Sequence, residues 1–344
     1  MRAFAIAVLS ISTVFAQNQC SQKCTPSQKL YFSNCEKVSV TPPAGPAVSC
    51  GVNLGISGDF LYWTVRQDGL FHAVSGVDAS IPAGSSVAKG RVHDLNWEMD
   101  PGFRVSLSYD LPHDGWELLG RYTWMRTDVA NTTRDPNLVS YWSINGNDPL
   151  KAIHSSSAKW KLHFDGAQLE LGRNCYLSQY LKLRPHVGLN AAWIDQSYEV
   201  IQMDSSTTDS MKLTQDFWGV GLQAGLNTSW QFLYQFSLFG DLDLSILWGQ
   251  FNLNRKDTTT AAGVTTSRVN VAVNPHTFEP VLGLAAGLRW EDWVSNNRYH
   301  YLFQAGWEHQ LWILQNELIK VNGEVGHTGD LVLQGLTVRA SLDF

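Results

Sequence analysis

Apolar and polar residues alternate one by one through most of this chain beyond Gly51, and this period of two constrains its fold more than any other feature. The alternation is plain over residues 103–110, 181–194 and 236–251. Successive side chains of a β-strand point to opposite faces, whereas an α-helix repeats every 3.6 residues. The pattern therefore predicts an all-β chain whose strands each have one apolar and one polar face.

Ten strand segments are expected, and the connections between them alternate between short and long. The short connections cover residues 111–115, 174–179, 231–235 and 292–298, whereas the long ones are polar. Short periplasmic turns and long extracellular loops are typical of an outer-membrane β-barrel. Because the strand number is even, both ends of such a barrel would lie on the periplasmic side. The expected strands are 52–65, 99–110, 116–126, 158–173, 180–194, 214–230, 236–251, 277–291, 299–313 and 331–344.

Two details of the pattern need separate interpretation. The apolar positions change phase between 160–164 and 167–171, which predicts a β-bulge near Asp165-Gly166. The long connection 127–157 contains residues 137–142, which could add another hairpin and raise the strand count to twelve.

Alternating strands fit either a transmembrane barrel or a soluble β-sandwich. Apart from the N-terminus, no apolar run reaches the 18 residues that a membrane helix needs. Aromatic residues gather at both ends of the expected strands, as in the aromatic belts of a membrane barrel. The last strand ends in Phe344, which resembles the assembly signal of bacterial outer-membrane proteins. We therefore expect a transmembrane antiparallel barrel, with outer-membrane lipid and the barrel-assembly machinery as partners. The belt residues are Trp124, Trp160, Trp193, Trp218 and Trp248 at one end and Trp116, Trp230, Trp290, Tyr299 and Tyr301 at the other.

The N-terminus predicts export. Met1-Arg2 supplies a positive start, an apolar stretch follows as far as Phe15, and Ala16 is a suitable cleavage position. We expect residues 1–16 to be a signal peptide, 17–50 a periplasmic extension rich in Cys and Pro, and 51–344 the barrel. An oxidising compartment favours disulfides, and an odd number of thiols leaves at least one free or bonded to another chain. The disulfide candidates are Cys20, Cys24, Cys35, Cys50 and Cys175.

Several short motifs resemble the Legionella-type major outer membrane protein family, which has MOMP-like relatives in chlamydia-like bacteria. They are Gly58-Asp59-Phe60-Leu61-Tyr62-Trp63, the Asp-Pro-Gly-Phe motif of residues 100–103 and the His-Asp-Gly-Trp motif of residues 113–116. The resemblance covers residues 51–344. It implies an abundant barrel of the bacterial outer membrane with porin-like passive diffusion of small hydrophilic solutes. It also implies an envelope role through disulfides to other copies or to other envelope proteins.

Charged residues on the polar strand faces are the candidates for lining the lumen. Basic residues concentrate on the second to fifth expected strands, and acidic ones on the seventh and eighth. Such a lumen could orient zwitterionic solutes, or salt bridges could lock it into a plug. Eight-stranded barrels are just filled by side chains, and porins with aqueous channels have about 16–18 strands, so a count of ten weighs against the porin-like activity that the resemblance implies. The candidates are Arg104, Glu117, Arg121, Lys161, Lys182, Arg184, Asp241, Asp243, Glu279, Arg289 and Arg339.

The sequence contains no motif that indicates catalysis, a cofactor or a metal site. Its histidines are scattered, and it has no HExxH, GxSxG or P-loop motif. A net charge of −6 argues against nucleic-acid binding, which needs a basic face. Two other function classes stay open, a non-conducting structural or adhesin barrel and an outer-membrane protease of the omptin type. The protease candidates at the outer rim are Asp195, Asp216 and His154.

Overall fold

The computed structural model describes residues 44–46, 48, 52–76, 90–111, 114–142, 152–320 and 329–344. The expected signal peptide and the candidates Cys20, Cys24, Cys35 and Cys50 lie outside the described residues. Over the described ranges the secondary structure is β throughout, as the period of two predicts.

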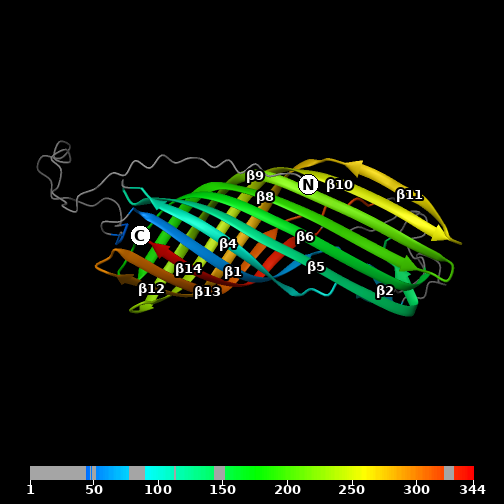
Figure 1. Ribbon diagram of the computed structural model, residues 1–344, viewed down its shortest axis with the longest axis horizontal. Helices are drawn as coiled ribbons and strands as arrows, with labels where there is room; N and C mark the ends of the chain where they lie inside the picture. Colours follow the sequence, from blue (N-terminus) through cyan, green and yellow to red (C-terminus); the bar gives the residue numbers. More distant parts are fainter. Residues whose placement is uncertain are drawn as a thin grey trace, which may run out of the picture.

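Ten antiparallel strands close into a barrel (Figure 1). Short strands β2 (Ala73–Ser75) and β3 (Arg91–His93) extend the sheet beside β5, β7 (Cys175–Tyr176) pairs with β8, and β11 (Val264–Val273) pairs with β10. In their order around the barrel, the ten strands are β1 (Leu54–Gln67), β4 (Met99–Asp110), β5 (Trp116–Ser140), β6 (Ala152–Arg173), β8 (Leu181–Met203), β9 (Thr207–Leu233), β10 (Phe236–Ala261), β12 (His276–Val294), β13 (Tyr299–Trp312) and β14 (Leu331–Asp343), which pairs with β1.

The expected ten-stranded barrel is confirmed, but several strands run further than the sequence pattern indicated. β5 continues to Ser140 and β10 to Ala261, whereas their alternation fades near residues 126 and 251. Residues 138 and 139 continue β5 and pair with β2 and β6, so the extra hairpin of the twelve-strand alternative does not form.

The two ends of the barrel differ in shape. One end, the turn end, holds the short connections and both ends of the barrel segment, where the Leu54 amide donates to the Phe344 carbonyl at 3.1 Å. At the opposite end, the loop end, the long strands β5, β9 and β10 and the hairpin strand β11 project beyond their neighbours (Figure 1).

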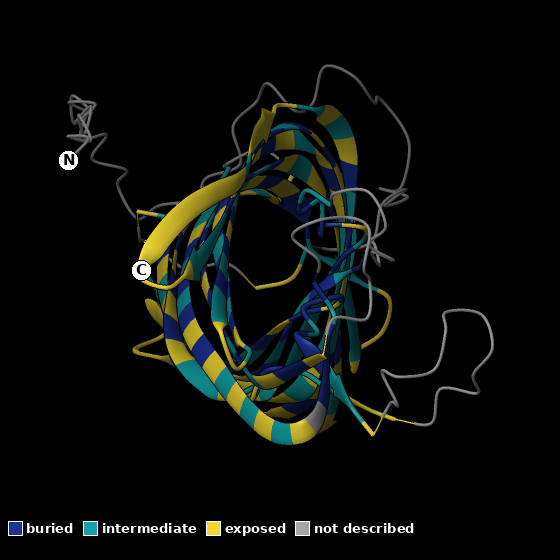
Figure 2. Ribbon diagram, turned by 90° about the vertical axis from the view of Figure 1, so that its right-hand side faces the viewer, coloured by how far each residue is buried: buried dark blue, intermediate teal, exposed yellow. Residues whose placement is uncertain are grey.

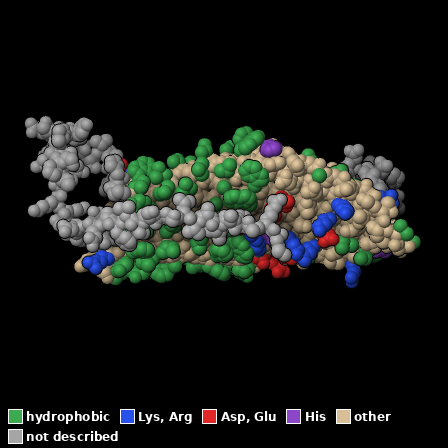
Figure 3. Space-filling model, turned by 45° about the horizontal axis from the view of Figure 1, so that its top comes forward, with side chains coloured by type: hydrophobic (Ala, Val, Ile, Leu, Met, Phe, Trp, Pro, Cys, Tyr) green, Lys and Arg blue, Asp and Glu red, His purple; other side chains and the backbone are tan. Residues whose placement is uncertain are grey.

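A band of exposed apolar side chains surrounds the half of the barrel next to the turn end (Figure 3). Trp193, Trp218 and Trp248 mark its border toward the loop end, and Trp230 and Phe236 mark its border at the turn end. An apolar outer band with aromatic borders is the lipid-facing surface of a membrane barrel. Among the described residues, no helix is long and apolar enough to cross a membrane.

Nearer the loop end, the apolar face of the same strands points inward. In β6, Trp160 and Leu162 are fully buried inside, whereas Leu169 and Leu171 are exposed outside. The pairing of β6 with β5 and β8 has no shift in register over residues 157–172. The predicted β-bulge near Asp165-Gly166 is therefore wrong, and Trp160 does not belong to the outer belt. The phase change is an exchange of the apolar face between outside and inside.

This exchange divides the barrel into two halves. The membrane half, next to the turn end, is apolar outside and polar inside, whereas the core half, next to the loop end, has an apolar interior. Striped burial along each strand in Figure 2 follows the alternation. The apolar interior of the core half gathers side chains from most strands, including Leu61, Trp63, Met125, Trp160, Ile194, Tyr198, Leu213, Phe217, Phe251, Trp312 and Leu333.

Two inward-facing glycines allow the strands of the membrane half to approach closely. A Cβ on Gly221 would lie 1.8 Å from the carbonyl oxygen of Ile246, and one on Gly188 would lie 2.1 Å from that of Leu169. Only glycine fits such a sharp bend of the barrel wall.

Candidate functional site

The lumen of the membrane half is the candidate site, because the polar faces of all ten strands meet there. Two cavities occupy it, one of about 70 Å³ at mid-barrel and one of about 220 Å³ at the turn end, called the vestibule. Their walls share Arg121, Asn227, Asp241, Gln304 and Arg339, so the two cavities are neighbours along the barrel.

The structure places most of the predicted lumen charges on these walls. Glu279 is also buried on the inner face but lies nearer the loop end, outside both cavities. The predicted lumen charges on the cavity walls are Arg104, Glu117, Arg121, Lys182, Arg184, Asp241, Asp243, Arg289 and Arg339.

Lys161 does not line the lumen. Its side chain is 51% exposed on the outer surface, where its Nζ lies 3.3 Å from Asp128 Oδ2. The sequence prediction failed because Lys161 stands between Trp160 and Leu162, whose apolar side chains were assigned to the lipid side. Both point into the core half, so Lys161 points outward.

The first charge cluster joins four strands at mid-barrel. Asp59 is fully buried and contacts Arg104 Nη1 at 3.3 Å and Arg339 Nη2 at 2.8 Å. Arg104 Nη2 reaches Glu308 Oε1 at 2.7 Å. Two guanidinium groups thus face two carboxylates, and each of these charges is compensated inside the barrel.

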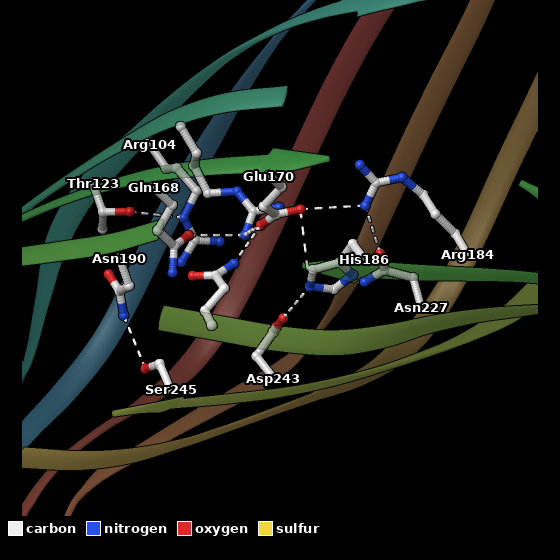
Figure 4. Close-up of polar contacts among 12 residues, drawn as sticks. Arg104, Thr123, Gln168, Glu170, Arg184, His186, Asn190, Asn227, Asp243 and Ser245 are labelled. Carbon is white, nitrogen blue, oxygen red and sulfur yellow. Dashed lines mark hydrogen bonds and ion pairs between the residues drawn. The ribbon is translucent and has the colours of Figure 1, made fainter. Parts of the chain in front are cut away.

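The second charge cluster centres on Glu170 (Figure 4). Its carboxylate lies 3.3 Å from Arg121 Nη1 and 3.2 Å from Arg184 Nη1. Arg184 Nε also contacts Glu117 at 2.9 Å. Beside it, His186 Nε2 lies 2.8 Å from Asp243 Oδ1. The cluster ties β5, β6, β8 and β10 together across the lumen.

Among the described residues, Glu170, His186 and Asp243 form a group compact enough to hold a metal ion. The arginines argue against this use, because both oxygens of Glu170 already accept guanidinium contacts from Arg121 and Arg184. A cation there would have to displace one positive group and tolerate the other. The group is better described as part of an ion-pair network.

Two connecting segments, together called the plug, lie inside the barrel toward the loop end. They are residues 68–72 and 315–319, which lie between strands and pack into the apolar interior of the core half. Leu70, His72 and Gln315 are completely buried, and Leu318 is 4% exposed. Leu70 and Leu318 belong to the same apolar cluster as the inward residues of the core half.

Hydrogen bonds from several strands hold the plug to the barrel wall, among them those of Tyr198 and Gln215. Tyr198 Oη donates to the Leu70 carbonyl at 2.7 Å. Gln215 binds residues 315–319 twice, through Nε2 to the Gln315 carbonyl at 2.6 Å and through Oε1 from the Glu317 amide at 2.9 Å. Asn316 Nδ2 donates to the Asp68 carbonyl at 2.7 Å and so joins the two plug segments.

The plug and its anchors were not predicted from the sequence. Residues 68–72 and 315–319 follow no period of two, so nothing in them predicted a place inside the barrel. The available signal was the phase change at 160–171, since an apolar face on the inner side needs apolar chain segments to pack against.

The residues proposed for a protease are not assembled into a site. Asp195 and Asp216 lie opposite each other on β8 and β9, on the outer face, and the residue opposite Asp195 on β6 is His163. His154 lies near the loop end of β6, where its ring contacts Asp204 at 3.4 Å and is 62% exposed.

Removing Asp59 tests whether the first charge cluster stabilises the barrel. Asp59→Asn leaves Arg104 and Arg339 facing each other without their shared carboxylate, so we expect unfolding to become easier by about 3–5 kcal/mol. Urea unfolding of the refolded protein, followed by its gel mobility, measures this. The control is Arg66→Gln, which breaks the half-exposed contact with Asp68 and should change stability by less than about 1 kcal/mol. Equal stability of the two variants would contradict the expectation.

Comparison with known proteins identifies the family. The family model described as Legionella pneumophila major outer membrane protein precursor matches residues 49–344. A search of curated proteins found no match.

Solved structures with a similar outline are distant. The outer membrane protease OmpT of Escherichia coli is 9% identical, with 85% of this chain and 96% of that chain covered and a TM-score of 0.45. A Pseudomonas aeruginosa FadL homologue is 8% identical, with 85% and 89% covered and a TM-score of 0.26. The toluene transporter TodX of P. putida is 8% identical, with 88% and 91% covered and a TM-score of 0.23.

The family match spans the whole barrel, and the apolar band with its aromatic borders is the surface such a protein presents to lipid. The chain therefore belongs to the Legionella major outer membrane protein family and is a β-barrel of the bacterial outer membrane.

Proposed function

We propose that this barrel lets small hydrophilic solutes diffuse passively across the outer membrane, and that the plug closes its lumen at rest. The observation that carries the proposal is the change in polarity of the lumen from the membrane half to the core half. A polar, charged cavity system in the membrane half ends against an apolar plug. That plug is built from connecting segments outside the ten barrel strands, so it can move without unfolding one of those strands.

The ion pairs across the lumen limit the size of the solutes that fit through it. Arg104, Glu170 and Arg184 reach across the lumen, and the cavities between such contacts hold about 70 and 220 Å³. Barrels with wide aqueous channels have about 16–18 strands. A ten-stranded barrel of this kind therefore suits small solutes at low conductance, rather than the wide flow of a large porin.

We also propose that the barrel has no catalytic role, and that its partners are outer-membrane lipid and the barrel-assembly machinery. The first point is supported by the separation of His154 from the Asp195–Asp216 pair. The second is supported by the apolar outer band and by the alternating residues of β14, the strand that closes the barrel against β1.

Single-channel recording in a planar bilayer tests the closed lumen. We expect the wild-type protein to open rarely and in small steps, because the plug fills the core half. Replacement of residues 314–329 by a short Gly-Ser turn removes one plug segment and should give steady openings. A matched replacement of residues 258–266 at the exposed tip of the β10–β11 hairpin should behave like wild type.

Two outcomes would contradict the proposal. Large, steady wild-type currents would show that the plug does not close the lumen. Silence of both the wild type and the plug variant, with correct folding, would favour a non-conducting structural or adhesin barrel.

Acid should favour opening. His72 in the plug is buried near His93, and both effects lower the pKa of His72 to about 4 from its ordinary 6.5. The closed state favours neutral His72. The free energy that stabilises the closed state is therefore fully present above about pH 6.5 and falls as the pH drops toward 4, in total by on the order of 3 kcal/mol. We expect openings to be more frequent near pH 5 than near pH 7.5. A His72→Gln protein that keeps the full pH response would contradict this assignment.

We further propose that disulfides link copies of the protein in the envelope. Cys175 lies in β7 at the turn end, partly exposed and without a disulfide among the described residues. Gly45, near the end of the N-terminal extension, lies against the ring of the neighbouring Tyr176. The described part of the extension therefore lies on the side of Cys175, and five thiols cannot all pair within one chain.

Non-reducing gels of membranes prepared with a thiol-blocking reagent test the cross-links. We expect bands of covalent multimers that disappear on reduction. Cys175→Ser is the informative variant, and Ser178→Ala in the same connection is its control. A purely monomeric band in the wild type would contradict cross-linking.

A further inference from the structure

Two basic side chains on one wall of the vestibule make no short contact with a carboxylate among the described residues. Arg289 of β12 donates only to the amide oxygen of Gln304, at 2.9 and 3.2 Å, among the described residues. Lys182 of β8 has its nearest carboxylate oxygen, on Glu291, at 3.9 Å, the limit of an ion pair. Both residues line the vestibule, and the strands between them carry small side chains such as Ser229 there.

Two carboxylates stand on the opposite wall. Asp110 of β4 and Asp343 of β14 line the vestibule on either side of β1, which contributes Gly55 and Ser57 between them. Asp343 contacts His300 at 2.7 Å but is 31% exposed, and no ion pair of Asp110 occurs within the described part of the chain. In the order of the ten strands, β1 lies opposite β9, so the carboxylate wall faces the basic wall.

The other vestibule charges do not cancel this separation. Arg339 is held by Asp59 and Arg184 by Glu117, so each is already neutralised. Glu291 stands on the basic wall, 3.9 Å from Lys182 and 3.8 Å from His300. Its single charge offsets only part of the positive charge of Lys182 and Arg289. Asp241 lies toward the mid-barrel cavity, whose wall it also forms. The vestibule therefore has a positive side and a negative side across a space of about 220 Å³.

We propose that the vestibule binds zwitterionic solutes of the α-amino acid class, as free amino acids or short peptides. The solute carboxylate would lie against Arg289 and Lys182, since a guanidinium binds a carboxylate through two parallel hydrogen bonds. Its ammonium group would lie against Asp110 and Asp343. A solute with a single charge satisfies one wall only, so the site discriminates against simple anions and cations. The inference rests on the proposed function, in which this vestibule is part of the solute path.

Saturation-transfer NMR on the refolded full-length protein tests the site directly. The probes are L-alanine, which carries both charges, acetate, which carries only the negative charge, and ethylammonium, which carries only the positive charge. We expect alanine to bind at least about tenfold more tightly than either singly charged probe. Lys182→Gln and Asp110→Asn should each weaken alanine binding by about tenfold, whereas Arg66→Gln, outside the lumen, should leave it unchanged.

The outcomes separate this inference from the proposed function. If acetate binds as well as alanine, or if alanine binding survives both lumen variants, the zwitterion site is wrong even when the plug variant conducts. If alanine binds as expected while neither the wild type nor the plug variant conducts, the site stands and passive diffusion fails. Arg289→Gln adds an independent variant should Lys182→Gln fail to fold.

Discussion

A β-strand has two faces, and each must meet surroundings of matching polarity along its whole length. In this barrel the surroundings change midway, because only the membrane half is in contact with lipid. The strands respond by exchanging their apolar face, as β6 does between Phe164 and Leu169. The position of the lipid band, the polar lumen and the apolar core half all depend on this exchange.

The exchange also explains why charges and apolar groups occupy different levels of one lumen. In the membrane half the outer faces of the strands are apolar, and the alternation makes the inward side chains polar. Where water is scarce, these polar and charged groups need hydrogen-bond or ion-pair partners. Asp59 and Glu170 achieve this through two arginines each. In the core half the outer surface is hydrated, and the interior packs like that of a soluble protein, with loop segments to fill it.

Much of the architecture could be predicted because period-two alternation is strong where one face contacts lipid. The strand number and the place of Arg104 or Arg289 follow from it. The alternation is weaker in the core half, where β10 continues through Thr258, Thr259 and Thr260 with little apolar signal, so its true length was hidden. Lys161 was misplaced because a single orientation was assumed for the whole strand. The plug was missed because irregular segments carry no period from which a position could be derived.

The exchange of faces has a consequence for how the protein folds. In a flat, unclosed sheet, the apolar residues of the two halves would lie on opposite sides: Leu169 and Leu171 on one, Trp160 and Leu162 on the other. Such a sheet cannot rest on a bilayer surface with all its apolar groups in lipid. The residues around Trp160 find an apolar environment only when the strands have curled and their ends have met. A half-closed intermediate would carry an exposed apolar surface in water, which is unfavourable. Insertion into the membrane and closure of the barrel are therefore coupled for this chain.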